Sequence, residues 1–201
     1  MGKRWGMVNF KNKCIEPSFI PDFPSNKDFS KYYQMVMEDF QIVIDYFPLL
    51  KITSLPTKRP KEIFISGDLI PKDVHDECIT ANDIERNSLY ILGIYPNDYP
   101  DSNIYVEDFY KKIDWSKIPD EHIHRTQHPV TKRVVLCTHH PSGEVNAFKQ
   151  KDKTVAVLAS AWKLYKQYKE FRKTKKWILK DLSHGSDATL QLKREGKHYD
   201  K

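Results

Sequence analysis

Apolar residues recur at three- and four-residue steps in the stretch that follows residue 27, which is the period of one face of an α-helix. We therefore predict an amphipathic helix over about 28–47. Ser25 or Asn26 is a suitable N-cap for it, and Pro48 favours its end. The predicted apolar stripe consists of Phe29, Tyr33, Val36, Phe40, Ile44 and Phe47.

Short apolar runs after this helix predict β-strands. The polar stretch between the second and third run, residues 67–87, is interpreted as a long hairpin connection. A further brief apolar segment, Val134–Leu136, comes later in the chain. The first four runs are Leu50–Leu55, Glu62–Ser66, Ser88–Tyr95 and Ile104–Val106.

The second half of the chain contains one more strongly periodic segment. Residues 107–128 predict a loop with a helical turn, and residues 138–150 predict a turn. A second helix is predicted over about 152–176. Its apolar stripe consists of Val155, Leu158, Ala159, Trp162, Tyr165 and Tyr168. Its exposed side carries Lys163, Lys166, Lys169 and Lys173.

Strands grouped between two helices predict an α+β fold with an antiparallel β-meander, because alternating βαβ units would give a different order. Residues 1–26 lack a clear period and are interpreted as an N-terminal arm, with one short strand near Trp5–Phe10. Residues 27–182 form the predicted domain. Residues 183–201 are charged and are interpreted as a polar tail.

Composition restricts the class of protein. The chain has 201 residues, of which 39% are hydrophobic and 30% charged, with a net charge of +6. No apolar run approaches the roughly 18 residues of a membrane helix. The first residues are not followed by the apolar segment of a secretory signal peptide, so we expect none. The three cysteines are widely spaced, which argues against a disulfide scaffold. We therefore expect a cytoplasmic protein with no membrane partner.

Two proline-containing motifs precede one of the cysteines. Tyr95-Pro96-Asn97-Asp98-Tyr99-Pro100 follows the predicted strand Ser88–Tyr95. His128-Pro129 comes later, and Cys137 lies nine residues beyond His128. A cysteine thiolate can act as a nucleophile and acyl carrier, because its thioesters stay reactive towards amines. Cys137 is therefore a candidate thioester carrier.

This ordered combination resembles the ubiquitin-conjugating (UBC-fold) enzymes. In that family a meander strand runs into a Phe-Pro-x-Asp-Tyr-Pro turn, and a His-Pro-Asn turn precedes the active cysteine. The leading helix and a tryptophan-bearing helix after the cysteine also have counterparts here. The resemblance covers roughly residues 27–176. It implies a UBC-like fold with an N-terminal helix, an antiparallel meander, an active-site loop and a long C-terminal helix.

The resemblance implies an acyl transferase that carries a ubiquitin-like modifier, or another protein with a free C-terminus, as a thioester on Cys137. The implied partners are an activating enzyme of ubiquitin type and a target protein. ATP would be spent by the activating enzyme, so we expect no cofactor and no metal here. In the family the leading helix is where the activating enzyme docks. Candidate catalytic residues are Cys137, His128, His139 and His140, with a histidine assisting transfer as a base.

The sequence departs from the family pattern in three respects. Val130 stands where the family has asparagine, which leaves the role of that residue unassigned. The stretch 107–127 is longer than in the compact family version, and one long helix replaces the usual C-terminal pair. These features resemble divergent bacterial UBC-fold proteins, which often occur in antiviral defence operons and join a protein's C-terminus to a target.

Three alternatives remain open at the level of sequence. The first is a metal-binding protein, although no standard zinc spacing is present. The second is a non-catalytic UBC-like binding module, which Val130 favours. The third, nucleic-acid binding through the basic helix, is disfavoured because aromatic residues at helical spacing usually belong to the core. The candidate metal ligands are His122, His124, His128, Cys137, His139 and His140.

Overall fold

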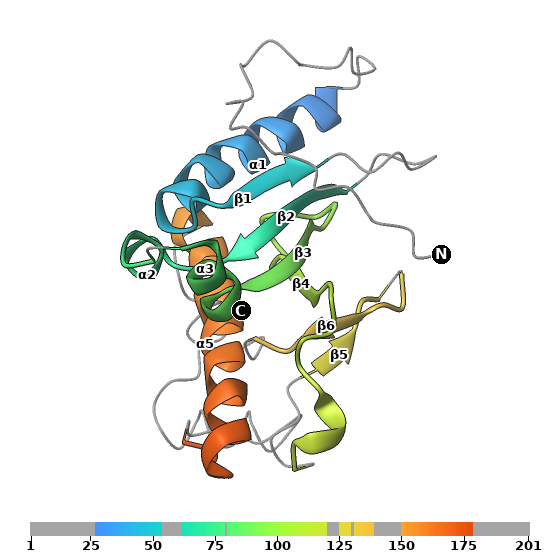
Figure 1. Ribbon diagram of the computed structural model, residues 1–201. Coiled ribbons are helices and arrows are strands. Elements are labelled where there is room, and N and C mark those ends of the chain that lie inside the picture. The colour runs from blue at the N-terminus through green and yellow to red at the C-terminus, as the bar shows by residue number, and fades with distance from the viewer. Residues whose placement is uncertain are drawn as a thin grey trace, which may run out of the picture.

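The computed structural model describes residues 27–53, 62–78, 80–119, 125–129, 131–138 and 150–178. A leading helix is followed by a meander of four strands, a separate two-stranded hairpin and a long second helix (Figure 1). This arrangement confirms the predicted α+β class with an antiparallel meander. The predicted N-terminal arm and polar tail lie outside the described residues.

Helix α1, Lys27–Tyr46, confirms the helix predicted from the apolar period. Its inward side is turned slightly from the predicted stripe, because Tyr32, Val36 and Val43 are buried whereas Tyr33 and Ile44 are only partly so. One charged residue, Asp39, lies on the buried side. Phe47 follows the helix and is buried, so its side chain fixes the connection between α1 and β1.

The four strands pair in sequence order, each antiparallel to the next. They are β1 (Leu50–Thr53), β2 (Ile63–Leu69), β3 (Leu89–Tyr95) and β4 (Tyr105–Asp108). All four confirm strands that the sequence predicts, with ends shifted by a few residues. Gly67 permits the close pairing of β1 and β2, since its φ is +145° and an added Cβ would lie 2.2 Å from the carbonyl oxygen of Leu49.

The stretch 67–87 does join two antiparallel neighbours, β2 and β3, as predicted, but it contains regular structure that the sequence analysis did not predict. Strand β2 continues to Leu69, and two short helices follow: α2, Lys72–Asp76, and α3, Ala81–Asn87. Helix α3 begins with a capping box in which the side chains of Thr80 and Asp83 each accept from the other's backbone N–H. This local signal is present in the sequence, but neither helix has a buried residue and therefore neither shows an apolar stripe.

The stretch 107–128 is only partly the loop that the sequence predicts. The expected helical turn is the 3₁₀ helix η1, Trp115–Lys117. Arg125–Gln127, however, forms strand β5, which pairs antiparallel with β6, Val134–Leu136. All three residues of β5 are exposed, so this strand has no apolar pattern by which it could be recognised.

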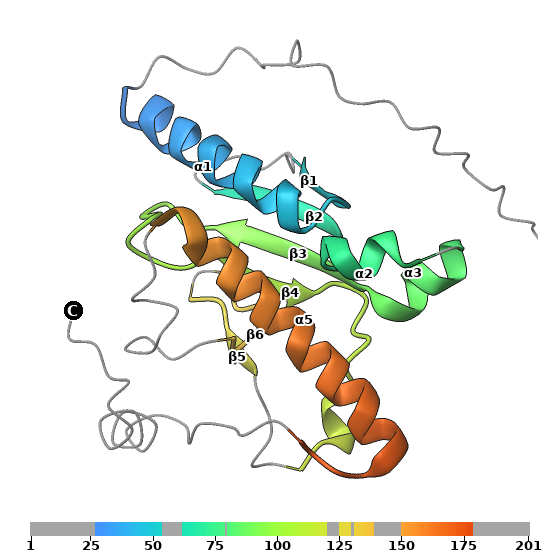
Figure 2. The same cartoon turned by 90° about the vertical axis from the view of Figure 1, so that its left-hand side faces the viewer.

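Helix α5, Gln150–Thr174, confirms the second predicted helix. It lies with α1 on the same face of the meander (Figure 2). Its buried side is rotated from the predicted stripe, because Trp162 and Val155 are only partly buried. The buried apolar residues are Val157, Leu158, Ala161, Leu164, Tyr165, Tyr168 and Phe171. Lys163 and Lys173 are exposed as predicted, whereas Lys166 and Lys169 are partly buried.

The hydrophobic core joins α1, the inner face of the sheet and α5. A smaller apolar cluster of Phe64, Leu92 and Ile94 lies on the other face of the sheet. Within the described residues, no helix is long and apolar enough to cross a membrane.

Candidate active site

Cys137 directly follows strand β6, at the end of the β5–β6 hairpin. Its side chain is partly exposed, and it forms no disulfide. Cys78, the other described cysteine, is also partly exposed, and its thiol donates to the carbonyl of Val74 at 3.2 Å. Cys14 lies outside the described residues. A thiol at the end of an ordered strand and open to solvent meets the first requirement for an acyl carrier.

The turn that leads into β6 is closed by backbone hydrogen bonds around His128. The N–H of His128 donates to the carbonyl of Arg133 at 2.8 Å, and the N–H of Lys132 donates to the carbonyl of His128 at 3.0 Å. Lys132 adopts the left-handed conformation with φ of 60°, which is uncommon for a residue other than glycine. This turn sets the direction of the strand that carries Cys137.

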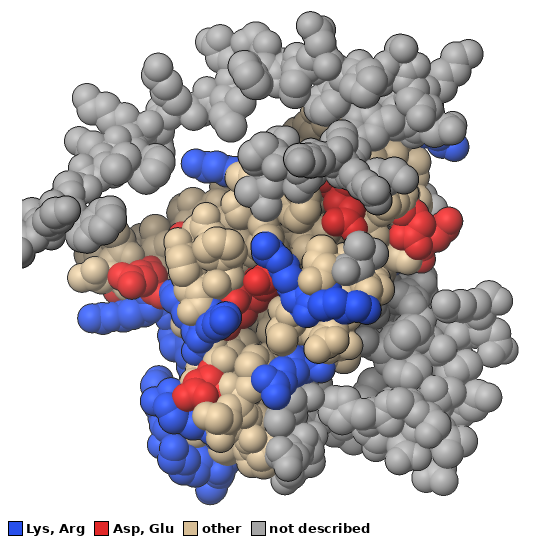
Figure 3. All heavy atoms as spheres, turned by 90° about the vertical axis from the view of Figure 1, so that its right-hand side faces the viewer, with Lys and Arg blue, Asp and Glu red and all other residues tan. Residues whose placement is uncertain are grey.

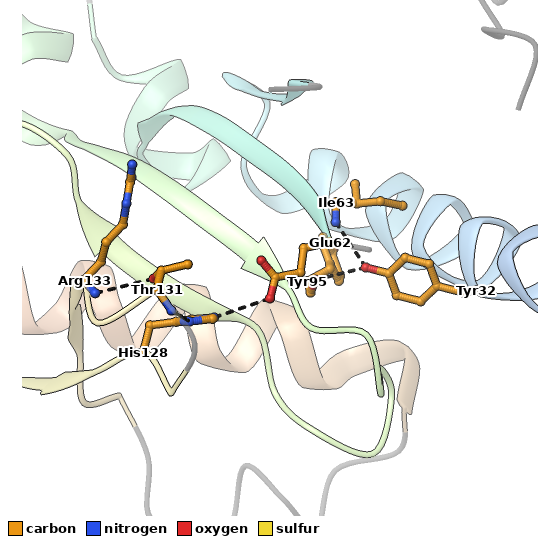
Figure 4. Close-up of polar contacts among 7 residues, drawn as sticks. All are labelled: Tyr32, Glu62, Ile63, Tyr95, His128, Thr131 and Arg133. Carbon is orange, nitrogen blue, oxygen red and sulfur yellow. Dashed lines mark hydrogen bonds and ion pairs between the residues drawn. The ribbon is translucent and has the colours of Figure 1, made fainter. Parts of the chain in front are cut away.

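The His128 imidazole is an internal part of this turn, with a side chain that is only 1% exposed. Its Nδ1 accepts a 3.1 Å hydrogen bond from the N–H of Thr131 (Figure 4). Its ring packs edge-on against Tyr105 at a centroid distance of 4.4 Å. Burial lowers the pKa of His128, and the nearby Arg133 lowers it further while Glu62 opposes both. These contacts indicate that the His128 imidazole is neutral and helps to hold the shape of the turn. The predicted catalytic role of His128 stays a prediction.

The hairpin is fastened to the body of the protein by contacts with β4 and η1. Arg133 donates to Glu107 of β4 at 3.0 Å, and the guanidinium of Arg125 lies 6.0 Å from the ring centre of Trp115. Lys132 and Arg133 are exposed, so the turn is basic. The side of the molecule towards which the turn projects in Figure 1 shows Lys and Arg interspersed with Asp and Glu (Figure 3). The basic turn and Cys137 lie at opposite ends of β6.

The remaining predicted site residues lie outside the described residues. These are His139 and His140, together with Val130 and the candidate metal ligands His122 and His124. The structure therefore describes two of the four predicted catalytic residues, Cys137 and His128, and places them at the two ends of one turn-and-strand segment. Among the described residues, no group of three or more potential metal ligands is brought together.

The Tyr95–Pro100 turn is held by its own side chains and by helix α5. The side chain of Asp98 accepts from the hydroxyl of Ser102 at 2.6 Å, and the Tyr99–Pro100 peptide is cis. The Tyr99 hydroxyl lies 3.3 Å from that of Thr154 in α5. The amine of Lys153 donates to the carbonyl of Pro100 at 2.6 Å. These contacts give the turn a structural role.

Two residues near the site carry no signal that sequence reasoning detects. The buried hydroxyl of Tyr32 accepts from the N–H of Ile63 at 3.1 Å and donates to the carbonyl of Tyr95 at 2.9 Å, so it ties α1 to two strands (Figure 4). Oε1 of Glu62, the residue before Ile63, lies 3.9 Å from Nε2 of His128. Both residues are ordinary members of their segments. Only the fold brings Glu62 to His128 and Tyr32 to the strands of the meander.

The comparisons with known proteins give no identification. No protein-family model matches the chain, and no curated protein or solved structure matches it. The site therefore has to be judged on its own geometry.

Proposed function

We propose that the chain is a ubiquitin-conjugating-like acyl transferase that carries a protein C-terminus as a thioester on Cys137 and passes it to an amine. The observation that carries the proposal is the position of Cys137: a partly exposed thiol that directly follows a strand set by the His128 turn. The order of helix, four-stranded meander, hairpin and long helix also supports it. A UBC-like fold is part of the proposal.

The chemistry has two transfers. In the first, the Cys137 thiolate attacks the activated carbonyl of the modifier on the activating enzyme, a new S–C bond forms and the donor's thiolate leaves. In the second, an amine attacks the thioester carbonyl, a C–N bond forms and the Cys137 thiolate leaves, while the amine's proton passes to a base.

The partners follow from this chemistry. An activating enzyme of ubiquitin type supplies the thioester and spends ATP, a ubiquitin-like modifier or another protein with a free C-terminus is carried, and a target protein supplies the amine. Bacterial antiviral defence is the setting that we propose, on the resemblance alone.

The decisive experiment is intact-mass spectrometry of the purified chain after incubation with ATP and the proteins encoded beside it in the genome. We expect an added mass equal to that of a modifier less one water, which disappears on treatment with a thiol and is absent from Cys137→Ala. An adduct that forms equally on Cys137→Ala, or no adduct with any neighbouring protein, would count against the transferase.

A further inference from the structure

The strongest unassigned relationship near the hairpin is between Glu62 and His128. Glu62 directly precedes β2, and its side chain is 18% exposed, whereas the His128 side chain is 1% exposed. They are far apart in sequence, and the fold brings Oε1 of Glu62 to 3.9 Å from Nε2 of His128. This distance is too long for a direct hydrogen bond and short enough for the carboxylate charge to act on the ring N–H.

The hydrogen bond on the other ring nitrogen fixes which tautomer is present. The N–H of Thr131 donates to Nδ1 of His128, so Nδ1 must be unprotonated. In a neutral imidazole the single proton then sits on Nε2, which is the nitrogen near Glu62. A carboxylate beside that N–H favours this tautomer, as it does for histidines that are oriented by a neighbouring acid.

We infer that Glu62 is a positioning residue for the Cys137 thiol. Its carboxylate keeps the proton of His128 on Nε2, so Nδ1 stays free to accept from Thr131 and the turn between β5 and β6 keeps its shape. The turn sets the direction of β6 and thereby the place of Cys137. Glu62 contacts neither substrate nor thiol in this account and acts through His128. The inference deepens the proposed function and rests on it for the role of Cys137.

Tyr32 extends this arrangement to helix α1. Its hydroxyl accepts from the N–H of Ile63 and donates to the carbonyl of Tyr95, and therefore holds the backbone next to Glu62 against α1 (Figure 4). Burial raises the pKa of Tyr32, so the hydroxyl keeps its proton and both hydrogen bonds persist across the physiological range. The backbone at Glu62 is thereby held in place, and this keeps the carboxylate of Glu62 near His128.

The test compares Glu62→Ala and Glu62→Gln with wild type and with Glu38→Ala. Glu38 is exposed on α1, where its described contact is with Gln34, so its removal controls for loss of one acidic residue. Nitrogen NMR shifts of the His128 ring report the tautomer, and amide hydrogen exchange reports the Thr131 bond. In Glu62→Ala we expect a larger Nδ1–H population and exchange at Thr131 at least about threefold faster. Glu62→Gln keeps an acceptor without the charge and should fall between.

Tyr32→Phe removes only the hydroxyl and should change His128 and Thr131 in the same direction as Glu62→Ala, but less. If the tautomer and the Thr131 exchange rate in Glu62→Ala equal those of Glu38→Ala, Glu62 does not position the turn and the inference is overturned. These readouts need no substrate, so they remain decisive if no thioester forms and the proposed function fails. Where the thioester does form, Glu62→Ala should lower kcat for loading with little change in KM.

Discussion

The hydroxyl of Tyr95, the last residue of β3, donates a 2.5 Å hydrogen bond to Oδ2 of Asp39 on the inward side of α1. Both side chains are almost completely buried. A carboxyl group in such a place favours its neutral form, and burial raises the pKa of Asp39 even though the Tyr95 hydrogen bond works against the rise. The contact therefore joins α1 to the sheet and makes the stability of that junction depend on pH.

The first prediction follows from the raised pKa of Asp39. A carboxyl group whose pKa is higher in the folded than in the unfolded state contributes stability at low pH, and this contribution is lost as the pH rises through the folded-state pKa. Asp39→Asn resembles the protonated form and should remove this dependence. The measurement is urea unfolding at a series of pH values from 4 to 8. The free energy of unfolding should fall less with rising pH in Asp39→Asn than in wild type. Asp45→Asn, at an exposed position of α1, is the control and should behave as wild type.

The second prediction concerns Cys137. Cys137→Ala should abolish the thiol-sensitive adduct and lower the free energy of unfolding by less than about 2 kcal/mol, because a small, partly exposed side chain is lost. Cys78→Ala should keep the adduct. The two variants are compared by intact mass and by thermal unfolding. Full adduct formation by Cys137→Ala would place the thioester on another cysteine and remove Cys137 as the carrier.

The third prediction concerns the histidines that directly follow the Cys137-Thr138 pair. Replacement of both His139 and His140 by Gln should slow discharge of a preformed thioester to an amine by about a hundredfold, the typical loss when a general base is removed. Single-turnover discharge of the isolated thioester measures this step without the activating enzyme. An unchanged rate would remove these two residues from the mechanism and leave Cys137 in place.

The fourth prediction locates the docking surface for the activating enzyme. Charge reversal of Lys27 and Lys31 at the start of α1 should slow loading of Cys137, because complementary charge governs the rate of encounter. Discharge of a thioester that is already formed should hardly change. The matched variant reverses Lys163, Lys166 and Lys169 on α5. If that variant slows loading instead, the activating enzyme docks on α5 and the analogy with the family fails at this point.

The fifth prediction concerns the short helix α3. The indole N–H of Trp162 in α5 donates to the carbonyl of Asn87 at 3.0 Å, and the amine of Lys112 lies near the carbonyls of Glu85 and Ser88. Trp162→Phe leaves the Asn87 carbonyl without this donor and should cost about 1 kcal/mol. Amide exchange of α3 should accelerate more than that of β3. Trp115→Phe, which alters the hairpin side of the molecule, should leave α3 unchanged.

Sequence reasoning succeeded where one face of an element is buried. Helix α1 and strands β2 and β3 have apolar residues at the period of their buried sides, so their type could be predicted without knowledge of their neighbours. It failed for α2, α3 and β5, which bury no side chain completely. Helix α3 has a capping box and a contact with α5, and β5 pairs with β6; none of these features gives an apolar period.

The residues of the candidate site also fall into two groups, those that local motifs mark and those that only the structure reveals. The order of local motifs marks Cys137 and His128 as candidates, and their catalytic roles stay predictions. Glu62 and Tyr32 could not be predicted, because their roles arise from distances between segments that are remote in sequence. Asp39 gives a partial signal, as a charged residue between Val36 and Val43 on an otherwise apolar side of the helix.

The sequence by itself therefore determined the α+β class, the extent of the two long helices, the strand order of the meander and the choice of Cys137 as the candidate nucleophile, since each depends on a local pattern. Only the tertiary structure decided that His128 is enclosed in the turn, that Glu62 faces its Nε2 and that Tyr32 joins α1 to the strands. Burial, tautomer and pKa depend on what surrounds a group in space, and a polar residue in the sequence carries no record of those surroundings.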